Sequence, residues 1–140
     1  MNNIDLLAET MAKTLDIYVQ WAKKNGLPEN EYFVLYSVYH NQQCSQKAIC
    51  EEWCLPKQTI SFVCKQLVER GWLTTEANPS DKRGKLHRLT ELGKAKIEPI
   101  ITKQTALELQ SAVDFGEEKL ALLVNELREF SLILNRNLGE

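Results

Sequence analysis

The stretch that decides the fold is residues 56–90, PKQTISFVCKQLVERGWLTTEANPSDKRGKLHRLT. Its first half predicts a helix over 56–70, because a proline opens it and a glycine follows it. Two short extended segments, 72–76 and 86–90, come next and enclose a polar tip rich in turn-forming and basic residues. The stretch therefore predicts a helix followed by a β-hairpin.

The residues upstream of this stretch predict a partner helix. Ser45 is a suitable N-cap for a short helix over 45–53, and only residues 54–55 separate that helix from the next. Two short helices joined by so tight a turn are typical of a helix-turn-helix. Apolar spacing and turn residues predict two earlier helices, over 3–25 and 28–41.

Downstream of the hairpin, the pattern predicts two long helices, over 91–113 and 116–137. The last one carries a wide apolar stripe for an outermost helix, made of Leu120, Leu123, Val124, Leu127, Phe130 and Leu134. Such a stripe is expected to meet the same surface of a second copy, so the sequence predicts a homodimer.

The elements together predict a mainly α (α+β) fold, a winged helix-turn-helix with a two-stranded β wing. We expect one domain over 1–140, with a DNA-binding lobe at 28–90. The flanking segments, 1–27 and 91–140, are expected to form a helical dimerisation region.

Charge is segregated along the chain, although the formal net charge is only −2. Residues 56–88 contain seven basic and three acidic side chains, a balance of +4, whereas residues 105–140 contain three basic and seven acidic ones, a balance of −4. Binding to phosphates depends on the local patch rather than on the total. The basic region coincides with the predicted helix and hairpin, which favours double-stranded DNA as the partner.

Composition predicts a cytoplasmic protein without a membrane partner. No segment approaches the roughly 18 apolar residues of a membrane span, and the first residues lack the basic and apolar regions of a secretory signal.

The helix over 56–70 divides into an apolar face and a polar face. Ile60, Val63, Cys64 and Leu67 share the face predicted to be core. The opposite side carries an amide, hydroxyls, an aromatic ring and a cation, the groups that contact base edges and phosphates. These predicted DNA-binding residues are Lys57, Gln58, Thr59, Ser61, Phe62 and Lys65. An ordinary solvated face would explain the polar residues equally well, but not Phe62, which could instead pack under the wing.

The tip of the predicted hairpin places Lys82, Arg83 and Lys85 together. An arginine there can enter a narrow minor groove, and Asp81 could orient the Arg83 guanidinium through a hydrogen bond. Charged hairpin tips also occur merely for solubility. The combination of helix, tight turn, helix and basic hairpin is far more specific than any one part.

Three segments within residues 45–97 resemble the multiple-antibiotic-resistance regulator (MarR) family. They are LVERGWL at 67–73, NPSDKRG at 78–84 and LTELG at 89–93. The resemblance implies a two-fold dimer of the terminal helices, with recognition helices in adjacent major grooves and wings in flanking minor grooves.

The resemblance also assigns individual residues. It places Gln58, Thr59, Ser61 and Lys65 at base-reading and phosphate positions, Ser45 and Gln46 at the phosphate-facing start of the third helix, and Arg83 and Asp81 in the wing. Many relatives carry arginine where this chain has Phe62, so an apolar contact and a different preferred operator are expected.

The sequence is compatible with two kinds of regulatory signal, a small-molecule effector and a change of redox state or metal binding at cysteines. Relatives often sense small phenolic or anionic molecules between the dimer helices and the DNA-binding lobe. Five aromatic residues are candidates for such a site, although packing in the core is favoured for each of them: Tyr18, Trp21, Tyr32, Tyr36 and Tyr39.

The cysteines provide the rival input. Cys50 and Cys54 would share a helix face if the third helix extends that far, and with His40 or Cys44 they could sense redox state or a soft metal. Buried structural thiols are the favoured interpretation, and Cys64 is expected in the core.

Other function classes receive less support. The sequence has no Gly-rich phosphate loop, no nucleophile motif and no strong metal-ligand spacing, which disfavours an enzyme and predicts neither a cofactor nor a metal site. A winged helix can also serve as a protein-interaction module, but the polar helix face and the cationic wing favour DNA.

Overall fold

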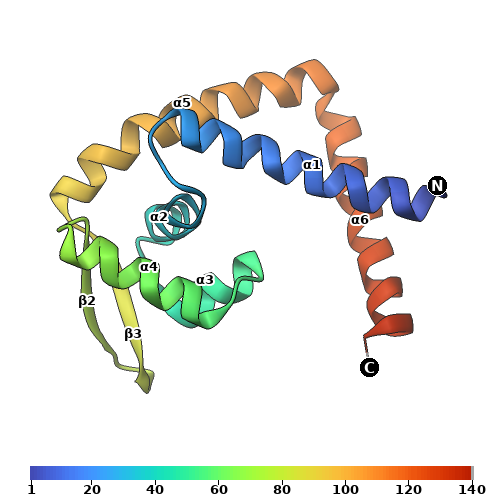
Figure 1. The fold of residues 1–140 in the computed structure, drawn as a ribbon. Helices are drawn as coiled ribbons and strands as arrows, with labels where there is room; N and C mark the ends of the chain where they lie inside the picture. Colours follow the sequence, from blue (N-terminus) through green and yellow to red (C-terminus); the bar gives the residue numbers. More distant parts are fainter. Residues whose placement is uncertain (140) are drawn as a thin grey trace. The chain divides into compact units, whose positions relative to one another are not determined.

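The computed structural model describes residues 1–139 and all of their side chains except that of Glu29. Its contacts gather in two units, residues 1–100 and residues 101–140, and each is described by itself. The first unit contains α1 (Asn3–Lys24), α2 (Glu29–Asn41), β1 (Gln43–Ser45), α3 (Gln46–Trp53), α4 (Lys57–Glu69), β2 (Leu73–Asn78), β3 (Asp81–Leu89) and the start of α5 (Glu91–Phe115). The second contains the rest of α5 and α6 (Glu117–Leu138). Figure 1 labels all of these elements except β1 and colours the ribbon along the chain.

The helix-turn-helix and its wing form as the sequence predicts, and the fold class is confirmed. The structure adds a third strand to the wing, because β1 pairs antiparallel with β3 and gives the sheet order β1-β3-β2. Strands β2 and β3 are also longer than predicted, since the ladder continues into the polar tip beyond a bulge at Ala77 and Asn78.

Local hydrogen bonds explain where the helices begin and end. The Ser45 hydroxyl accepts from the backbone N–H of Ala48 at 3.1 Å and caps α3, as predicted. Helix α4 ends at Glu69, and Gly71, two residues later, has a φ of 85° in the left-handed region that glycine adopts without strain. The turn between α3 and α4 contains Cys54 in a left-handed conformation, with φ of 53°.

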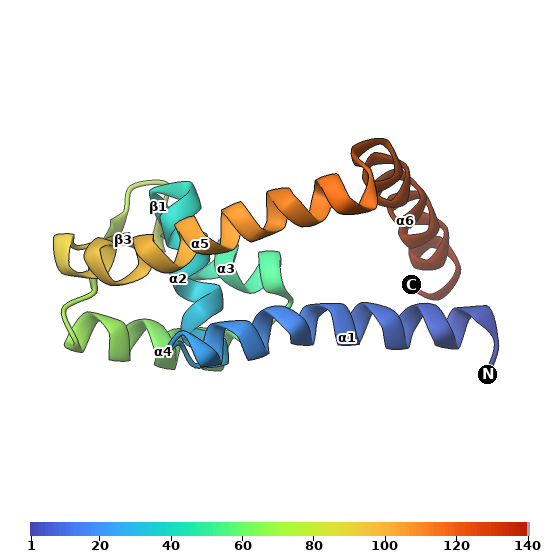
Figure 2. The same ribbon diagram turned by 90° about the horizontal axis from the view of Figure 1, so that it is seen from above.

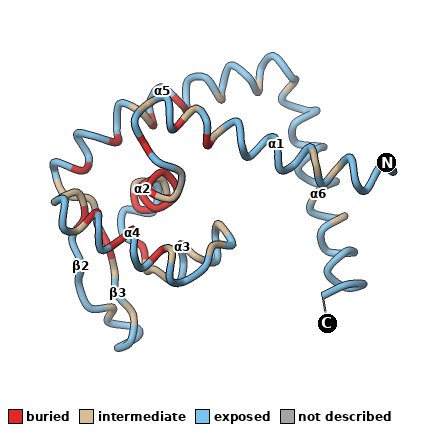
Figure 3. Tube along the Cα trace, in the orientation of Figure 1, coloured by how far each residue is buried: buried red, intermediate tan, exposed pale blue. Residues whose placement is uncertain are grey.

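The core of the first unit is centred on α2. Seen from above, α2 lies between α4 and the sheet (Figure 2). Buried positions concentrate along α2 and on one side of α4 (Figure 3). The four predicted core residues of α4 are all buried: Ile60, Val63, Cys64 and Leu67.

The junction between the wing and α5 explains the LTELG segment. Thr90 donates a hydrogen bond to the Gly71 carbonyl at 2.6 Å and accepts one from the Gly93 backbone N–H at 3.0 Å. A Cβ at position 93 would lie 2.2 Å from the Trp72 carbonyl oxygen, so only glycine fits there. This contact fixes the base of the wing against the start of α5.

The second unit has little core of its own. Within residues 101–139, Ile101 and Gln104 are buried, and α6 buries none of its side chains. None of the helices in residues 1–139 combines the length and the apolar character that crossing a membrane requires.

Candidate nucleic-acid interface

The outer face of α4 presents the predicted contact residues to solvent. Gln58, Ser61, Phe62 and Lys65 are exposed, and Thr59 is half-buried. Lys57 is also exposed and is the first residue of the helix. Among the described residues no side chain caps this end of α4, so its first backbone N–H groups remain available to an anion such as a phosphate.

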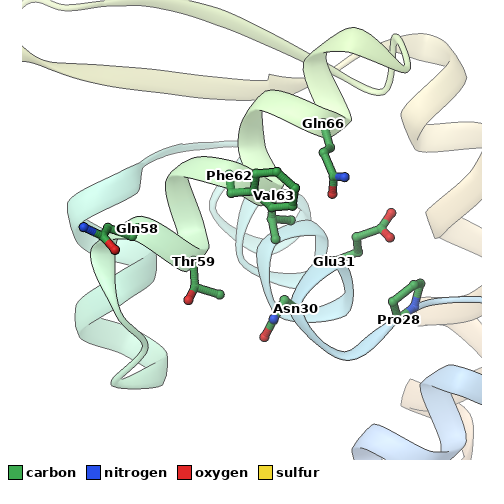
Figure 4. A pocket seen from close by; sticks show the side chains of 8 residues that line it. All are labelled: Pro28, Asn30, Glu31, Gln58, Thr59, Phe62, Val63 and Gln66. Carbon is green, nitrogen blue, oxygen red and sulfur yellow. The ribbon is translucent and has the colours of Figure 1, made fainter.

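A hollow of about 560 Å³, open to solvent, lies beside this face (Figure 4). Thr59, Phe62 and Gln66 of α4 line it on one side, and Glu31 of α2 lines it on the other. Glu31 accepts a hydrogen bond from Arg70, whose guanidinium also lies 4.8 Å from the centroid of the Trp72 ring. The hollow therefore borders the predicted DNA-contacting surface, and the carboxylate at its edge, Glu31, is paired with Arg70.

Ion pairing divides the basic residues of 56–88 into two groups. Arg70 pairs with Glu31, and Arg88 pairs with Glu76 at 2.7 Å and also donates to Gln43. The other five cations form no ion pair with a described carboxylate, and they are the ones that the sequence analysis assigns to DNA: Lys57, Lys65, Lys82, Arg83 and Lys85. An unpaired surface cation can replace the counterions of a phosphate without first losing a partner.

Backbone turns shape the wing tip. The Asp81 carboxylate accepts from the backbone N–H of Arg83 at 3.0 Å, and Asn78 accepts from the backbone N–H of Ser80 at 3.0 Å. The structure thus differs from the expectation that Asp81 binds the Arg83 guanidinium, because a carboxylate two residues earlier reaches the backbone first. The Arg83 side chain is exposed on this hydrogen-bonded turn.

The start of α3 is tied to the wing through a residue that sequence analysis treated only as part of a strand. His87 is 1% exposed, and its Nε2 lies 3.0 Å from the Gln46 side-chain nitrogen. Its Nδ1 lies 3.2 Å from both the Thr74 carbonyl oxygen and the Thr75 hydroxyl. Since a carbonyl only accepts, Nδ1 carries the proton and Nε2 accepts from Gln46.

This contact changes the interpretation of Gln46. Its amide is engaged within the fold and orients α3 against β3, whereas the sequence analysis assigned it to phosphate. Burial lowers the pKa of His87, which keeps the ring neutral and able to accept that hydrogen bond. No alternation of apolar residues marks His87 in the sequence, because it is the one buried residue of β3 and its neighbour Leu86 is only half-buried.

The candidate effector residues separate into different environments. Tyr32 is buried. The Tyr36 ring packs edge-on against Trp53, with ring centroids 5.8 Å apart, and in a tilted arrangement against His40, with centroids 4.2 Å apart. Tyr39 donates to Glu98 at 3.4 Å, and its pKa is raised by burial and by that carboxylate. The residues that line the hollow beside α4 do not include any of the five aromatic candidates for the effector site.

Trp53 extends this aromatic cluster from α2 to α3, a role that the sequence analysis did not assign. Its indole N–H donates to the Ser37 hydroxyl at 2.6 Å, and Ser37 in turn donates to Glu52 at 2.9 Å. Tyr18 and Trp21 are half-buried residues of α1.

The four cysteines are free thiols. Burial raises the pKa of Cys44 to about 11 and that of Cys64 to about 12, and it also raises the pKa of Cys50. Such thiols stay protonated near neutral pH and are poor nucleophiles. Because α3 ends at Trp53, Cys54 lies beyond the helix face that carries Cys50. Within the described residues, no group of three His, Cys, Asp or Glu side chains is placed to hold a metal ion.

A helix-turn-helix followed by a β-hairpin defines this chain as a winged-helix protein. Residues 25–84 match the model of the MarR family. The resemblance to the MarR family seen in the sequence is thereby confirmed over these residues.

The whole chain is also similar to solved structures of MarR family regulators. NMB1585, a MarR family regulator from Neisseria meningitidis, is 29% identical in sequence with a TM-score of 0.88, and the match covers 99% of this chain and 98% of that one. No curated protein matches the chain in the sequence comparison.

Two more distant structures share the fold. One is Bordetella bronchiseptica BpsR, whose DNA binding is described as regulated by 6-hydroxynicotinic acid. It is 21% identical in sequence with a TM-score of 0.70, and the match covers 91% of this chain and 96% of that one. A cysteine-to-serine mutant of E. coli MarR, complexed with operator DNA, is 20% identical with a TM-score of 0.70 over 90% and 91%.

Proposed function

We propose that the chain is a cytoplasmic, sequence-specific regulator of transcription that binds double-stranded DNA as a homodimer, and that it acts as a ligand-responsive repressor. The observation that carries this proposal is the set of five unpaired cations around the polar face of α4 and the wing tip. Phosphate binding uses such cations, and base reading uses the amide and hydroxyl groups between them.

The proposed dimer rests on exposed apolar side chains. In α6, Leu120, Leu123, Val124 and Leu134 are all more than one-third exposed. Large exposed apolar stripes on a helix are typical of a surface that a partner covers. A two-fold dimer predicts a near-palindromic operator, with half-sites about one helical turn, roughly 10 base pairs, apart.

The proposed effector is a small hydroxylated aromatic acid. BpsR supports this class, because its DNA binding is described as regulated by 6-hydroxynicotinic acid. The raised thiol pKa values disfavour the rival redox input. A panel of hydroxylated aromatic acids, 6-hydroxynicotinic acid among them, is added to the preformed DNA complex. Release of the duplex supports the effector proposal, and an unchanged complex across the panel contradicts it while leaving DNA binding intact.

DNA binding is tested by selecting bound sequences from random duplexes and then measuring affinity across a salt series. We expect a sequence-specific complex whose affinity falls steeply with salt, because bound phosphates release counterions. An absence of specific duplex binding at low salt would contradict the proposed function and favour a protein-interaction module.

Arg83→Ala tests the role of the wing. We expect affinity for every duplex to fall roughly tenfold and the salt slope to decrease by about one per wing. Lys13→Ala is the matched control, since Lys13 is an exposed cation of α1 that already pairs with Glu9. Equal effects of the two substitutions would contradict a wing contact.

A further inference from the structure

Phe62 is an exception among the apolar residues of its region. It is 61% exposed, whereas Ile60, Val63 and Leu67 on the same helix are almost completely buried. Among the described side chains between residues 18 and 91, Phe62 is the only large hydrophobic one that is exposed. An aromatic ring held in water on an otherwise polar face loses the stabilisation that burial would provide. This placement indicates a contact that is made only in a complex.

The neighbours of Phe62 indicate the chemistry of that contact. Gln58 lies one helical turn before it and Gln66 one turn after it, and both are exposed amides. Thr59 and Gln66 line the same open hollow as the Phe62 ring (Figure 4). Uncharged amide and hydroxyl groups thus flank the ring along the helix, and Glu31, the carboxylate that also lines the hollow, is paired with Arg70. Such uncharged groups contact base edges rather than phosphates.

We propose that Phe62 determines specificity by packing its ring against the C5-methyl group of thymine in the major groove. This inference rests on the proposed DNA-binding function. The thymine methyl is the one apolar group that the major groove presents, and an aromatic ring is a suitable contact for it. A glutamine can bind adenine through two hydrogen bonds, so Gln58 and Phe62 together select A·T base pairs.

The distribution of charge on α4 supports a base contact at this position. The two cations of the exposed face, Lys57 and Lys65, lie at the first residue of the helix and in its second half. Phe62 lies between them, and its residue type can bind a base edge but cannot neutralise a phosphate. The cations thus fix the helix on the DNA backbone, and Phe62 contributes discrimination between bases.

Replacing thymine by uracil tests the proposal, because this change removes only the methyl group and keeps base pairing. The full-length protein is first used to select its preferred duplex from random sequences, and each thymine of a half-site is then replaced in turn. We expect one position at which uracil weakens wild-type binding about fourfold, the effect of one buried methyl group.

The same duplexes are then measured with Phe62→Ala and Phe62→Leu. We expect the alanine variant to bind the thymine and uracil duplexes equally, and the leucine variant to keep part of the difference. Leu92→Ala is the matched control, because Leu92 is an exposed apolar residue outside α4 and its loss should leave the thymine preference unchanged. Unchanged thermal unfolding of each variant shows that the fold is retained.

Two results would overturn the proposal while leaving the proposed function standing. One is equal binding of thymine and uracil at every position by the wild-type protein. The other is a thymine preference that persists in full in Phe62→Ala. Loss of all specific duplex binding by the wild-type protein is a distinct result, which overturns the proposed function and this inference together.

Discussion

Helices α4 and α6 carry similar sequence patterns and have opposite environments. Each has an apolar stripe at helical spacing, but the stripe of α4 is buried at Ile60, Val63 and Leu67, whereas α6 buries no side chain. Periodicity therefore identifies the apolar face of a helix, but it does not identify the surface that covers this face. In α4 the partner is the chain itself, and in α6 we propose that it is a second copy.

The largest expected effect is the loss of stability when a leucine of α4, rather than one of α6, is truncated. Leu67→Ala should lower the free energy of unfolding by about 3 kcal/mol, because it leaves a cavity in a closely packed core. Leu132→Ala in α6 should change it by less than about 0.5 kcal/mol, since that side chain is 72% exposed. Urea denaturation of both variants measures the difference, and similar losses would show that α6 is packed as tightly as α4.

A charge placed in the α6 stripe should disrupt the dimer. Leu123→Glu is expected to weaken dimerisation roughly 100-fold, because each copy would bury an unpaired carboxylate. Leu122→Glu is the matched control, because Leu122 lies outside the stripe, about 100° around the helix from Leu123. Both leucines are at least half exposed, so either variant should fold. Sedimentation measures the mass, and dimers of Leu123→Glu at micromolar concentration would contradict an interface at this stripe.

The smallest effect concerns pH and belongs to the first unit. Burial lowers the pKa of His87 below its ordinary 6.5, so the folded protein keeps the ring neutral where the unfolded chain would bind a proton. Protonation thus favours the unfolded chain, and stability is lost as the pH falls from about 6.5 toward the lowered pKa.

His87→Asn removes this titration. We expect the wild type to be more stable than the variant, and this difference in the free energy of unfolding should become smaller as the pH falls below 6.5. Only the wild type loses the stabilisation that depends on a neutral His87. Leu67→Ala keeps His87 and should lose stability in parallel with the wild type. A constant gap between wild type and His87→Asn would show that the ring is not held neutral.

Several features of the site could be predicted from local chemistry. Ser45 caps α3 because its hydroxyl reaches a backbone N–H three residues on, and Gly71 ends α4 because glycine adopts a positive φ. The five cations of the candidate interface could also be chosen from sequence, since charge segregates along the chain. Which of the other basic residues are paired could not be predicted, because Arg70 and Glu31 lie 39 residues apart and meet only through packing.

The sequence by itself determined the order of the helices, the helix-turn-helix, the wing and the exposed face of α4, because capping, turn chemistry and periodicity act over a few residues. Only the tertiary structure decided which polar side chains form hydrogen bonds within the fold. It added β1 to the sheet, directed Gln46 to His87 and turned Asp81 toward the backbone of Arg83. Most of these outcomes depend on residues that are distant in sequence and are brought together by burial, and no local pattern contains that information.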